Sequence, residues 1–392
     1  MKYTITALFI AFMTFLQGCE NLLTKKLYEK VKIEVYGNSM IIPITINGKS
    51  YNFQLDTGAP TSISEELFNT LGLPVKDTLS AYDYYGNHKL EKSSVLSEIQ
   101  IGKSKFYKIK VSNTRPIQSL QICDVKIDGY LGSDFFADKI LLIDIKKREI
   151  IFTNRLQSLA LDKKNALKIK LIGVQKTPEI PIYFTSKKAG EYVWFDTGSA
   201  NYLYRLNSSI FNKMRKDSII TNDDIIYTHE IMGRGLFGPQ NDSINYVVLY
   251  DSIKICSTLL LNYSATTFSS SFDNSILGAP LLQKGIVAID YINEYFYFNP
   301  YSETPINYEP KHGFYLNYKD DKVYIEYVIP GSMGDLNGIK KGYVIKQINS
   351  VMFDSLSKCE LLNLDLKSEI ENQTTEYIFE YDNREIPITI KN

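Results

Sequence analysis

The sequence predicts an all-β protein in which two similar halves precede a smaller third part. Tyrosine (29 residues) and phenylalanine (20 residues) are abundant among its 392 residues, and aromatic residues favour strands. Short apolar runs broken by turn residues fill the first half and return in the same order in the second. The tripeptide Asp-Thr-Gly occurs in each half, at Asp56 and at Asp196. A chain of this length is expected to form two or three domains.

Asp56 lies at the end of a predicted hairpin. Two apolar runs, residues 41–46 and 51–55, flank an Asn-Gly pair, which predicts two strands joined by a turn. The second strand breaks into a Thr-Gly turn directly after Asp56. An unpaired carboxylate in a buried position is costly, so an acid at this point requires a partner or a function.

Further landmarks repeat in each half. An apolar-apolar-Gly element is followed by an apolar strand that ends in Asp. The glycine and the aspartate lie 12 positions apart in both halves, from Gly132 to Asp144 and from Gly278 to Asp290. Landmarks in the same order at nearly constant spacing indicate an internal duplication. Asp144 and Asp290 precede turns, where Asp is common, so we interpret them as structural.

Other local patterns predict one helix and a hairpin tip. Residues 62–71 form the clearest helical pattern of the first half, and Ser64 is its expected N-cap. Residues 80–88 combine aromatic residues with a Gly-Asn turn, which predicts the tip of a hairpin. The Gly-rich residues 232–238 take the corresponding place in the second half.

The duplicated motifs resemble aspartic proteases of the pepsin and retropepsin kind. In that family each lobe supplies an apolar-Asp-Thr-Gly turn, and a later apolar-apolar-Gly strand crosses beneath it. Residues 130–132 and 276–278 match this second element, and the resemblance covers residues 31–301. It implies an all-β fold with two homologous acid-protease-type β-barrel lobes. Ala59 follows the first turn, as in retropepsins, and Ser199 follows the second, as in pepsins.

The resemblance implies that Asp56 and Asp196 form a catalytic dyad. Two carboxyl groups held about 3 Å apart cannot both ionise, so they share one proton. The ionised carboxyl acts as general base on a water molecule, and the protonated one acts as general acid toward the scissile carbonyl. This chemistry needs no Ser or Cys nucleophile, and no local motif indicates one.

Neighbouring residues would support the dyad and bind substrate. By resemblance, the glycines donate backbone N–H groups to the carboxylates, and the threonines hydrogen-bond across the lobe junction. These dyad-supporting residues are Thr57, Gly58, Thr197 and Gly198. The hairpin tip would close over substrate as a flap, with Tyr84, Tyr85 and Gly86 at its end. An ordinary exposed hairpin is the alternative interpretation of this tip.

After Pro300 the repeat ends, and the following sequence resembles bacterial PDZ domains. Residues 329–350 carry a Pro-Gly-Ser start and a Gly-Ile-x-x-Gly segment like the PDZ signature, although Tyr343 stands where Asp is usual. The resemblance implies a small PDZ-like, β-rich domain of the α+β kind. Gly313 and Phe314 would lie in the loop that binds a peptide carboxylate through backbone N–H groups. A domain that only packs against the second lobe, with its groove blocked, is the alternative.

The N-terminus predicts a targeting segment. Lys2 and the apolar residues 5–15 have the length of a signal peptide, which is short for a bilayer span. Residues 16–19, Leu-Gln-Gly-Cys, resemble the bacterial lipoprotein box. This implies lipidation of Cys19 and an anchor in a membrane of the bacterial cell envelope, with the protein facing outside the cytoplasm. A plain secretory signal with an incidental cysteine is the alternative.

These observations divide the chain into five segments. They are residues 1–19 as lipoprotein signal peptide and lipobox, 20–30 as tether, 31–157 as the first aspartic protease lobe, 158–303 as the second lobe and 304–392 as the PDZ-like domain. Because both lobes lie in one chain, we expect a monomer.

The composition narrows the set of partners. Lysine and arginine together number 44, as do aspartate and glutamate, and no basic cluster occurs, so nucleic-acid binding is not indicated. Histidine occurs three times, and Cys123, Cys256 and Cys359 lie far apart, so we predict no metal site and no cofactor. The cysteines also show no disulfide framework, and we interpret them as small buried hydrophobic residues.

The sequence thus predicts a lipid-anchored aspartic-type endopeptidase that acts on a peptide or protein substrate. The PDZ-like module would add peptide or protein recognition. A non-catalytic peptide-binding lipoprotein on the same scaffold is the main alternative. A glycosidase with two carboxylates is a weaker alternative, because glycosidase acids need no Asp-Thr-Gly turn and lie further apart.

Overall fold

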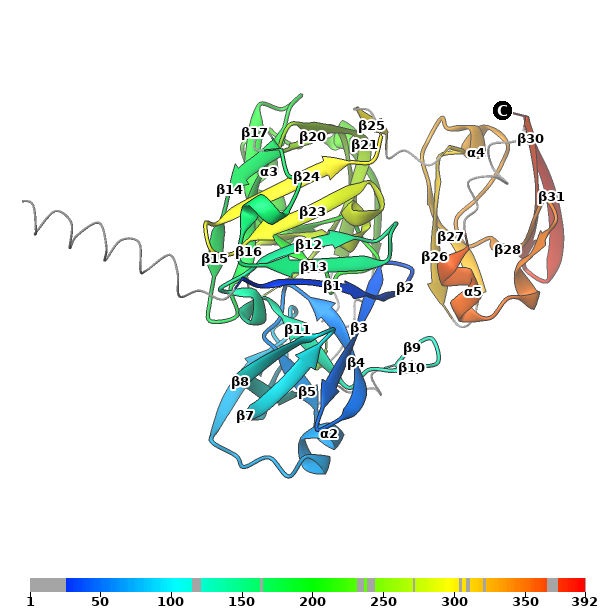
Figure 1. Ribbon diagram of the computed structural model, residues 1–392. Coiled ribbons are helices and arrows are strands. Elements are labelled where there is room, and N and C mark those ends of the chain that lie inside the picture. Colours follow the sequence, from blue (N-terminus) through cyan, green and yellow to red (C-terminus); the bar gives the residue numbers. More distant parts are fainter. Residues whose placement is uncertain are drawn as a thin grey trace, which may run out of the picture.

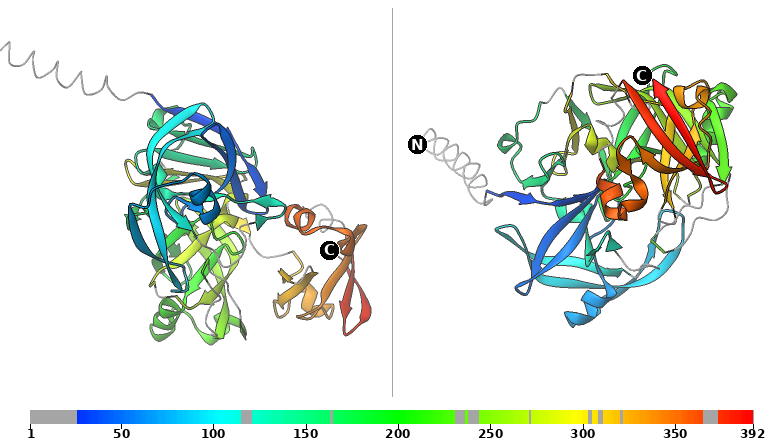
Figure 2. Two further views of the ribbon diagram at one scale, coloured as in Figure 1. Left: turned by 90° about the horizontal axis from the view of Figure 1, so that it is seen from below. Right: turned by 90° about the vertical axis from the view of Figure 1, so that its right-hand side faces the viewer.

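The structure is a computed structural model that describes residues 26–114, 121–162, 165–230, 236–237, 244–270, 272–302, 305–307, 311–319, 322–364 and 373–391. The predicted signal peptide and Cys19 lie outside the described residues. Strands predominate, which confirms the predicted all-β class. Figure 1 shows two lobes and a third domain at the C-terminal end of the chain, and Figure 2 shows the third domain from two further sides.

The first lobe contains a closed barrel of six strands. Its elements are β2 (Glu34–Tyr36), β3 (Ser39–Ile46), β4 (Lys49–Asp56), β5 (Ser62–Ser64), α2 (Glu65–Thr70), β6 (Asp77–Tyr82), β7 (His88–Ile101), β8 (Ser104–Thr114), β9 (Gln121–Ile122), β10 (Val125–Lys126) and β11 (Gly129–Gly132). The ring runs β3-β4-β11-β5-β8-β7 and closes because β3 also pairs with β7, at Thr45 and Gln100. β2 and β6 extend this sheet at its two ends.

The second lobe repeats this architecture. Its elements are β15 (Lys170–Ile172), β16 (Thr177–Phe184), β17 (Ala189–Asp196), β18 (Tyr204–Asn207), α3 (Ser208–Lys216), β19 (Ile225–Glu230), β20 (Ile244–Ile255), β21 (Thr258–Phe268), β22 (Ser275–Gly278) and β25 (Ile306–Asn307). The ring β16-β17-β22-β18-β21-β20 closes through the pairing of β16 with β20. Each strand of this ring has a counterpart in the first barrel, which confirms the predicted duplication.

A six-stranded sheet joins the two lobes and crosses their junction in Figure 1. Its strands are β1 (Tyr28–Lys32), β12 (Ile140–Asp144), β13 (Glu149–Thr153), β14 (Ala166–Lys168), β23 (Gly285–Asp290) and β24 (Tyr295–Pro300). The central strands β12 and β23 come from different halves and pair antiparallel. Asp144 accepts a hydrogen bond from the Lys147 N–H (3.1 Å), and Asp290 accepts one from the Asn293 N–H (2.9 Å), so both stabilise turns.

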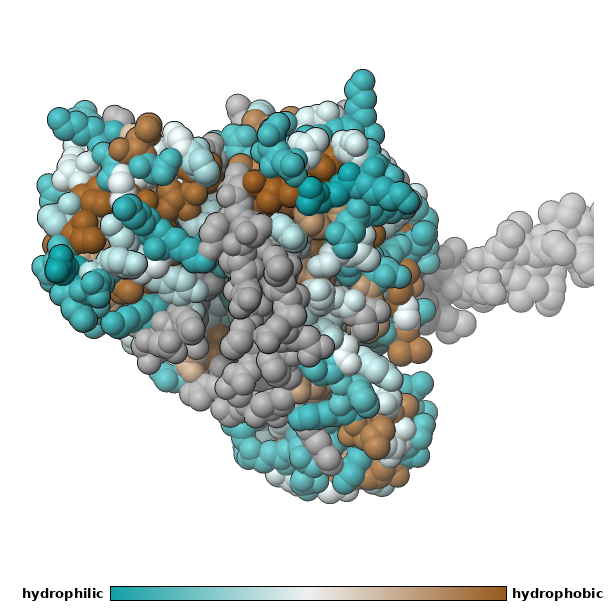
Figure 3. Space-filling model, turned by 180° about the vertical axis from the view of Figure 1, so that it is seen from behind, coloured by the Kyte–Doolittle hydropathy of each residue, from teal (hydrophilic) through white to brown (hydrophobic). Residues whose placement is uncertain are grey.

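One continuous hydrophobic core fills both lobes, and the third domain has a separate core. The elements of the third domain are β26 (Phe314–Lys319), β27 (Lys322–Val328), α4 (Met333–Leu336), β28 (Val344–Ile348), β29 (Val351–Met352), α5 (Lys358–Asn363), β30 (Thr374–Tyr381) and β31 (Arg384–Lys391). Its main sheet has the order β26-β27-β28-β30-β31. Figure 3 shows hydrophobic residues in small groups among hydrophilic ones on the coloured part of the visible surface.

The structure adjusts two local predictions. Residues 62–71 begin as the short strand β5, and the helix α2 starts only at Glu65. Ser64 is its N-cap as predicted, because its side chain accepts a hydrogen bond from the Leu67 N–H (3.1 Å). Most of the Gly-rich segment 232–238 lies outside the described residues, but the strands on either side of it, β19 and β20, pair as a hairpin.

The interpretation of all three cysteines as buried hydrophobic residues is wrong. Cys123 and Cys359 form a disulfide across a sequence separation of 236 residues. It connects the first lobe to the third domain, and Cys256 is free. The sequence could not reveal this pair, because three scattered cysteines have no spacing that identifies partners.

The crossing of β22 beneath the second Asp-Thr-Gly turn requires glycine at residue 278. A Cβ atom there would lie 2.2 Å from the Tyr202 carbonyl oxygen and 2.5 Å from that of Ser199. Because both obstacles are backbone atoms, we expect Gly278→Ala to lower the free energy of unfolding by about 1–3 kcal/mol or more. Gly48→Asn is the control, since residue 48 has open space and a left-handed φ of +78° that Asn tolerates. Equal urea denaturation midpoints for the two variants would contradict this prediction.

Candidate active site

The two predicted acids end equivalent strands, and the structure brings them together. Asp56 is the last residue of β4, and Asp196 is the last residue of β17. Beneath them, β11 runs parallel to β4 with Gly132 beside Asp56, and β22 runs parallel to β17 with Gly278 beside Asp196. The same register in both lobes places the two carboxyl groups at equivalent points, where the lobes meet.

Each glycine of the two turns backs the carboxyl group of the other lobe. A Cβ atom on Gly58 would lie 2.6 Å from Cγ of Asp196, and a Cβ atom on Gly198 would lie 2.6 Å from Oδ2 of Asp56. Only a residue without a side chain allows this approach. The glycine N–H groups also donate to the acid of their own turn, over 3.0 Å to Asp56 Oδ1 and 2.8 Å to Asp196 Oδ1.

Reciprocal hydrogen bonds through the two threonines join the turns. Thr57 Oγ1 donates to the Phe195 carbonyl (2.8 Å), and Thr197 Oγ1 donates to the Leu55 carbonyl (3.0 Å). Each hydroxyl also accepts the backbone N–H of the opposite threonine, over 3.0 Å in both directions. All four bonds are buried and cross between the lobes, as the resemblance implies.

The carboxyl groups of Asp56 and Asp196 hydrogen-bond to each other. Desolvation raises the pKa of Asp56 well above its usual range, and the charge of Asp196 and this hydrogen bond raise it further. Desolvation also raises the pKa of Asp196, while hydrogen bonds from the Gly198 N–H and from Asp56 act to lower it. Two carboxyls in direct contact are also closer than the roughly 5 Å that glycosidases use, which argues against that alternative.

The predicted flap is a hairpin whose tip contacts the second lobe. β6 and β7 pair with Tyr82 opposite His88, and Gly86 sits in the turn between them with a φ of +83°. Tyr84 packs its ring 4.7 Å from that of Phe268, and its hydroxyl donates to the Asn274 carbonyl (2.6 Å). Tyr84 and Tyr85 line the cleft above the acids, and Gly86 shapes the turn.

Arg205 is a site residue that sequence reasoning missed. Its Nη1 donates to the Tyr85 hydroxyl (2.8 Å), and its guanidinium lies 4.6 Å from the Phe268 ring centre. Arg205 pairs with Ile276 in β18 and β22, where the first lobe pairs Ser62 with Tyr130. The signal available in the sequence was this difference between the halves: the second half has the cation Arg205 at the strand position where the first half has the small residue Ser62.

The acids and the flap line a cleft of about 2520 Å³, here called the central cleft. Both lobes contribute to it, and so do Tyr318, Tyr324, Glu326 and Lys341 of the third domain. Leu236 and Phe237, the two described residues of the Gly-rich segment 232–238, also line it. Within the described parts of the chain, no three His, Cys, Asp or Glu side chains gather as metal ligands.

The predicted carboxylate loop of the third domain lies outside the central cleft lining. Gly313 has a left-handed φ of +72°, and its carbonyl accepts the Ile329 N–H (2.7 Å). A Cβ atom on Gly313 would lie 2.0 Å from Cβ of Ser332, so glycine is required. Phe314 begins β26, and its side chain is buried in the domain core.

Comparison with known proteins supports the resemblance over the first lobe. A family model described as aspartyl protease matches residues 42–135, which include the first Asp-Thr-Gly turn, the flap hairpin and the crossing strand β11. The second lobe, which this family model does not cover, repeats the same closed six-stranded barrel. Among solved structures, a retropepsin-like aspartic protease from Rickettsia conorii is similar at 19% identity and a TM-score of 0.25, covering 33% of this chain and 96% of that one. No curated protein matches the sequence.

The hydroxyl of Thr197 is predicted to hold the two lobes together. Thr197→Val removes the donor to Leu55 and the acceptor for Thr57 and leaves two buried backbone groups unpaired. We expect a loss of about 1–3 kcal/mol in the free energy of unfolding for each unpaired group. Thr197→Ser keeps the hydroxyl and is the control. Equal urea denaturation of the Val and Ser variants would contradict this role.

The raised pKa of Asp56 predicts a distinct dependence of stability on pH. The folded state holds the proton more tightly than the unfolded chain, so this stabilisation is complete below the unfolded pKa and is lost as pH rises through the folded pKa. The Asp56→Asn variant has no carboxyl group at this position and so does not show this loss of stability with pH. We expect its free energy of unfolding to increase relative to that of the wild type as pH rises above about 3.9, the ordinary Asp pKa.

Asp144→Asn provides a control with the opposite sign. Desolvation acts to raise the pKa of Asp144, but hydrogen bonds from the Lys147 N–H and the Tyr301 hydroxyl lower it overall. Its stabilisation is present above the unfolded pKa and lost as pH falls through the folded pKa. Thermal unfolding between acidic and neutral pH should therefore show opposite trends for the two variants. Parallel trends would refute the assignment of the raised pKa to the dyad.

Proposed function

We propose that the protein is an aspartic endopeptidase with Asp56 and Asp196 as its catalytic dyad. The observation that carries this proposal is that the two turns meet across the lobe junction, with the glycine of each turn packed against the carboxyl group of the other. A buried pair that holds one proton presents a general acid and a general base to the same point. Both side chains line the central cleft, which is large enough for a peptide.

In the proposed reaction, the ionised carboxyl takes a proton from a water molecule, and the water oxygen attacks the scissile carbonyl carbon. The protonated carboxyl donates its proton to the carbonyl oxygen, which gives a neutral tetrahedral diol. Proton transfer to the amide nitrogen then breaks the C–N bond and releases the amine and the acid. Because the two acids titrate as a pair, the proton belongs to the dyad and not to one residue.

The flap would cover the bound peptide. Tyr84 and Tyr85 project from the hairpin tip over the cleft, and the tip is held by Asn274 and Arg205 of the second lobe. Substrate entry would require these contacts to open. A closed flap would exclude water from the reacting groups and strengthen their electrostatic interactions.

We also propose that the third domain is a PDZ-like module for peptide or protein recognition. Its small sheet with two short helices and the left-handed Gly313 before β26 support this assignment. Lipidation of Cys19 would anchor the protein in the bacterial cell envelope, facing outside the cytoplasm, and we expect a monomer with a peptide or protein substrate. No helix within the described ranges is long and apolar enough to cross a membrane.

Loss of either acid is predicted to abolish proteolysis. Purified protein is incubated with casein or a peptide library at acidic to neutral pH, and products are identified by mass spectrometry. Asp56→Asn and Asp196→Asn should each lower kcat/KM by at least about 100-fold, because each removes one partner of the acid–base pair. Asp144→Asn, which alters a turn carboxylate outside the cleft, should retain cleavage.

Two outcomes would count against catalysis. Undiminished cleavage by both dyad variants would remove Asp56 and Asp196 from the mechanism. Peptide binding without turnover by the wild-type protein throughout this pH range would instead favour a non-catalytic peptide-binding protein on the same scaffold.

A further inference from the structure

The third domain contributes side chains to the same cleft as the dyad. Tyr318, Tyr324, Glu326 and Lys341, here called the third-domain wall, line the central cleft together with Asp56 and Asp196. In Figure 1, β26 and β27 form the side of the third domain that is nearest to the lobes. The cleft is therefore built from three parts of the chain and not from the two lobes alone.

The strand pattern of β27 explains why the wall faces away from the core of its own domain. Val323 and Ile325 contact the core of the third domain. Successive side chains of a strand point to opposite faces, so Tyr324 and Glu326 project from the other face. β27 also contacts the second lobe directly, because the Tyr327 hydroxyl hydrogen-bonds that of Ser264 in β21 (2.6 Å).

A series of contacts runs from the flap tip to this wall. Tyr85 accepts the hydrogen bond from Arg205, and the Arg205 guanidinium lies 5.5 Å from the ring centre of Tyr202. Desolvation raises the pKa of Tyr202, and the nearby Glu326 and Tyr324 act on it electrostatically. Tyr202 therefore lies between the flap-tip contact and the third-domain wall.

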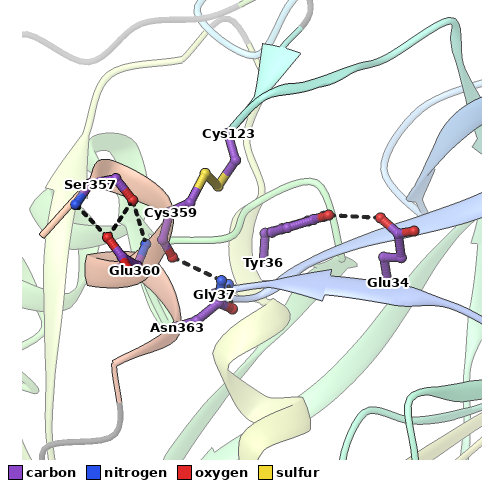
Figure 4. Close-up of a disulfide and its surroundings, with 8 residues drawn as sticks. All are labelled: Glu34, Tyr36, Gly37, Cys123, Ser357, Cys359, Glu360 and Asn363. Atoms are coloured by element: carbon purple, nitrogen blue, oxygen red, sulfur yellow. Dashed lines mark hydrogen bonds between the residues drawn. A yellow bond between two sulfur atoms is a disulfide. The ribbon is translucent and has the colours of Figure 1, made fainter.

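Covalent and polar links hold the wall in place. Figure 4 shows the Cys123–Cys359 disulfide joining the first lobe, between β9 and β10, to the third-domain helix α5. Close to it, the Asn363 side chain accepts a hydrogen bond from the Gly37 N–H (3.3 Å). A covalent link between parts far apart in sequence restricts their relative motion, so the third-domain wall stays close to the rest of the cleft.

The helix that carries Cys359 is capped at its start. Ser357 and Glu360 form a capping box, in which the Ser357 N–H donates to Glu360 (2.8 Å) and the Ser357 hydroxyl accepts the Glu360 N–H (3.3 Å). A cap of this kind stabilises the first turn of a helix, where Cys359 lies. The disulfide thus attaches to the capped first turn of α5.

We propose that the third-domain wall binds the part of a substrate peptide that extends beyond the immediate neighbours of the scissile bond. The wall presents two tyrosine rings and one side chain of each charge, so it suits an extended peptide with a bulky apolar or aromatic side chain. This inference rests on the proposed proteolytic function. It gives the third domain a direct part in substrate selection at the active site, in addition to any peptide binding at its own loop.

A peptide-length series tests this proposal. A cleaved sequence from the library is made as a short peptide that spans only the neighbours of the scissile bond, and as versions extended at either end. Tyr324→Ala should lower kcat/KM roughly two- to tenfold for an extended peptide, which is the value of one aromatic contact. The short peptide should be cleaved at the wild-type rate, because it does not reach the wall.

Tyr381→Ala is the matched control, since Tyr381 is an exposed tyrosine of the third domain that does not line the cleft. It should leave the cleavage of all peptides unchanged. An equal effect of Tyr324→Ala on short and extended peptides, or no effect on any, would overturn the proposal. If the wild-type protein cleaves no peptide, the proteolytic function fails, and the wall is tested by binding instead. The Kd values of the same peptides are then measured for wild type and Tyr324→Ala. A weaker Kd of the variant for the extended peptides alone supports the wall, and an equal change for all peptides, or none, overturns it.

The disulfide provides a second test. In the variant with both Cys123→Ser and Cys359→Ser, only non-covalent contacts position the third domain. The advantage in kcat/KM of the extended peptide over the short one should decrease, while cleavage of the short peptide persists. An unchanged advantage would show that the disulfide does not position the wall.

Discussion

The buried hydrogen bonds between Thr57 and Thr197 are the constraint on which the site depends. Each threonine bonds the backbone of the opposite lobe, so the two turns cannot separate without breaking four buried bonds. The acids are adjacent only because these turns are held in register. The close approach of Gly58 and Gly198 to the opposite carboxyls follows from the same arrangement. The shared six-stranded sheet supports it from the other side of the junction.

The two halves of this site are related but not identical. In the first lobe, Ser133 donates to the Thr57 carbonyl (2.9 Å) and hydrogen-bonds Tyr291 of the second half (2.7 Å). Ala279 takes the corresponding place after Gly278 and has no hydroxyl. In the second lobe, the cation Arg205 contacts Tyr85 at the hairpin tip. The two acids therefore have different surroundings.

Local patterns in the sequence were enough to predict strands and a duplication, because the same motifs recur in both halves, and the family resemblance then implied the two barrels. They also predicted the meeting of Asp56 and Asp196, since two Asp-Thr-Gly turns carry a specific resemblance. They did not predict the Cys123–Cys359 disulfide or the third-domain wall. Both depend on how separate domains are placed relative to one another. This placement arises from contacts between residues distant in sequence, such as Ser264 and Tyr327, and such contacts produce no repeating pattern in the sequence.

The central claim is that Asp56 and Asp196 share one proton at a pH where exposed aspartates are ionised. Neutron diffraction from crystals grown at about pH 6, well above the ordinary Asp pKa of about 3.9, tests it most directly. We expect a single deuteron between the two carboxyl groups, within the hydrogen bond that joins them. Two fully ionised carboxylates with no deuteron between them would contradict the claim.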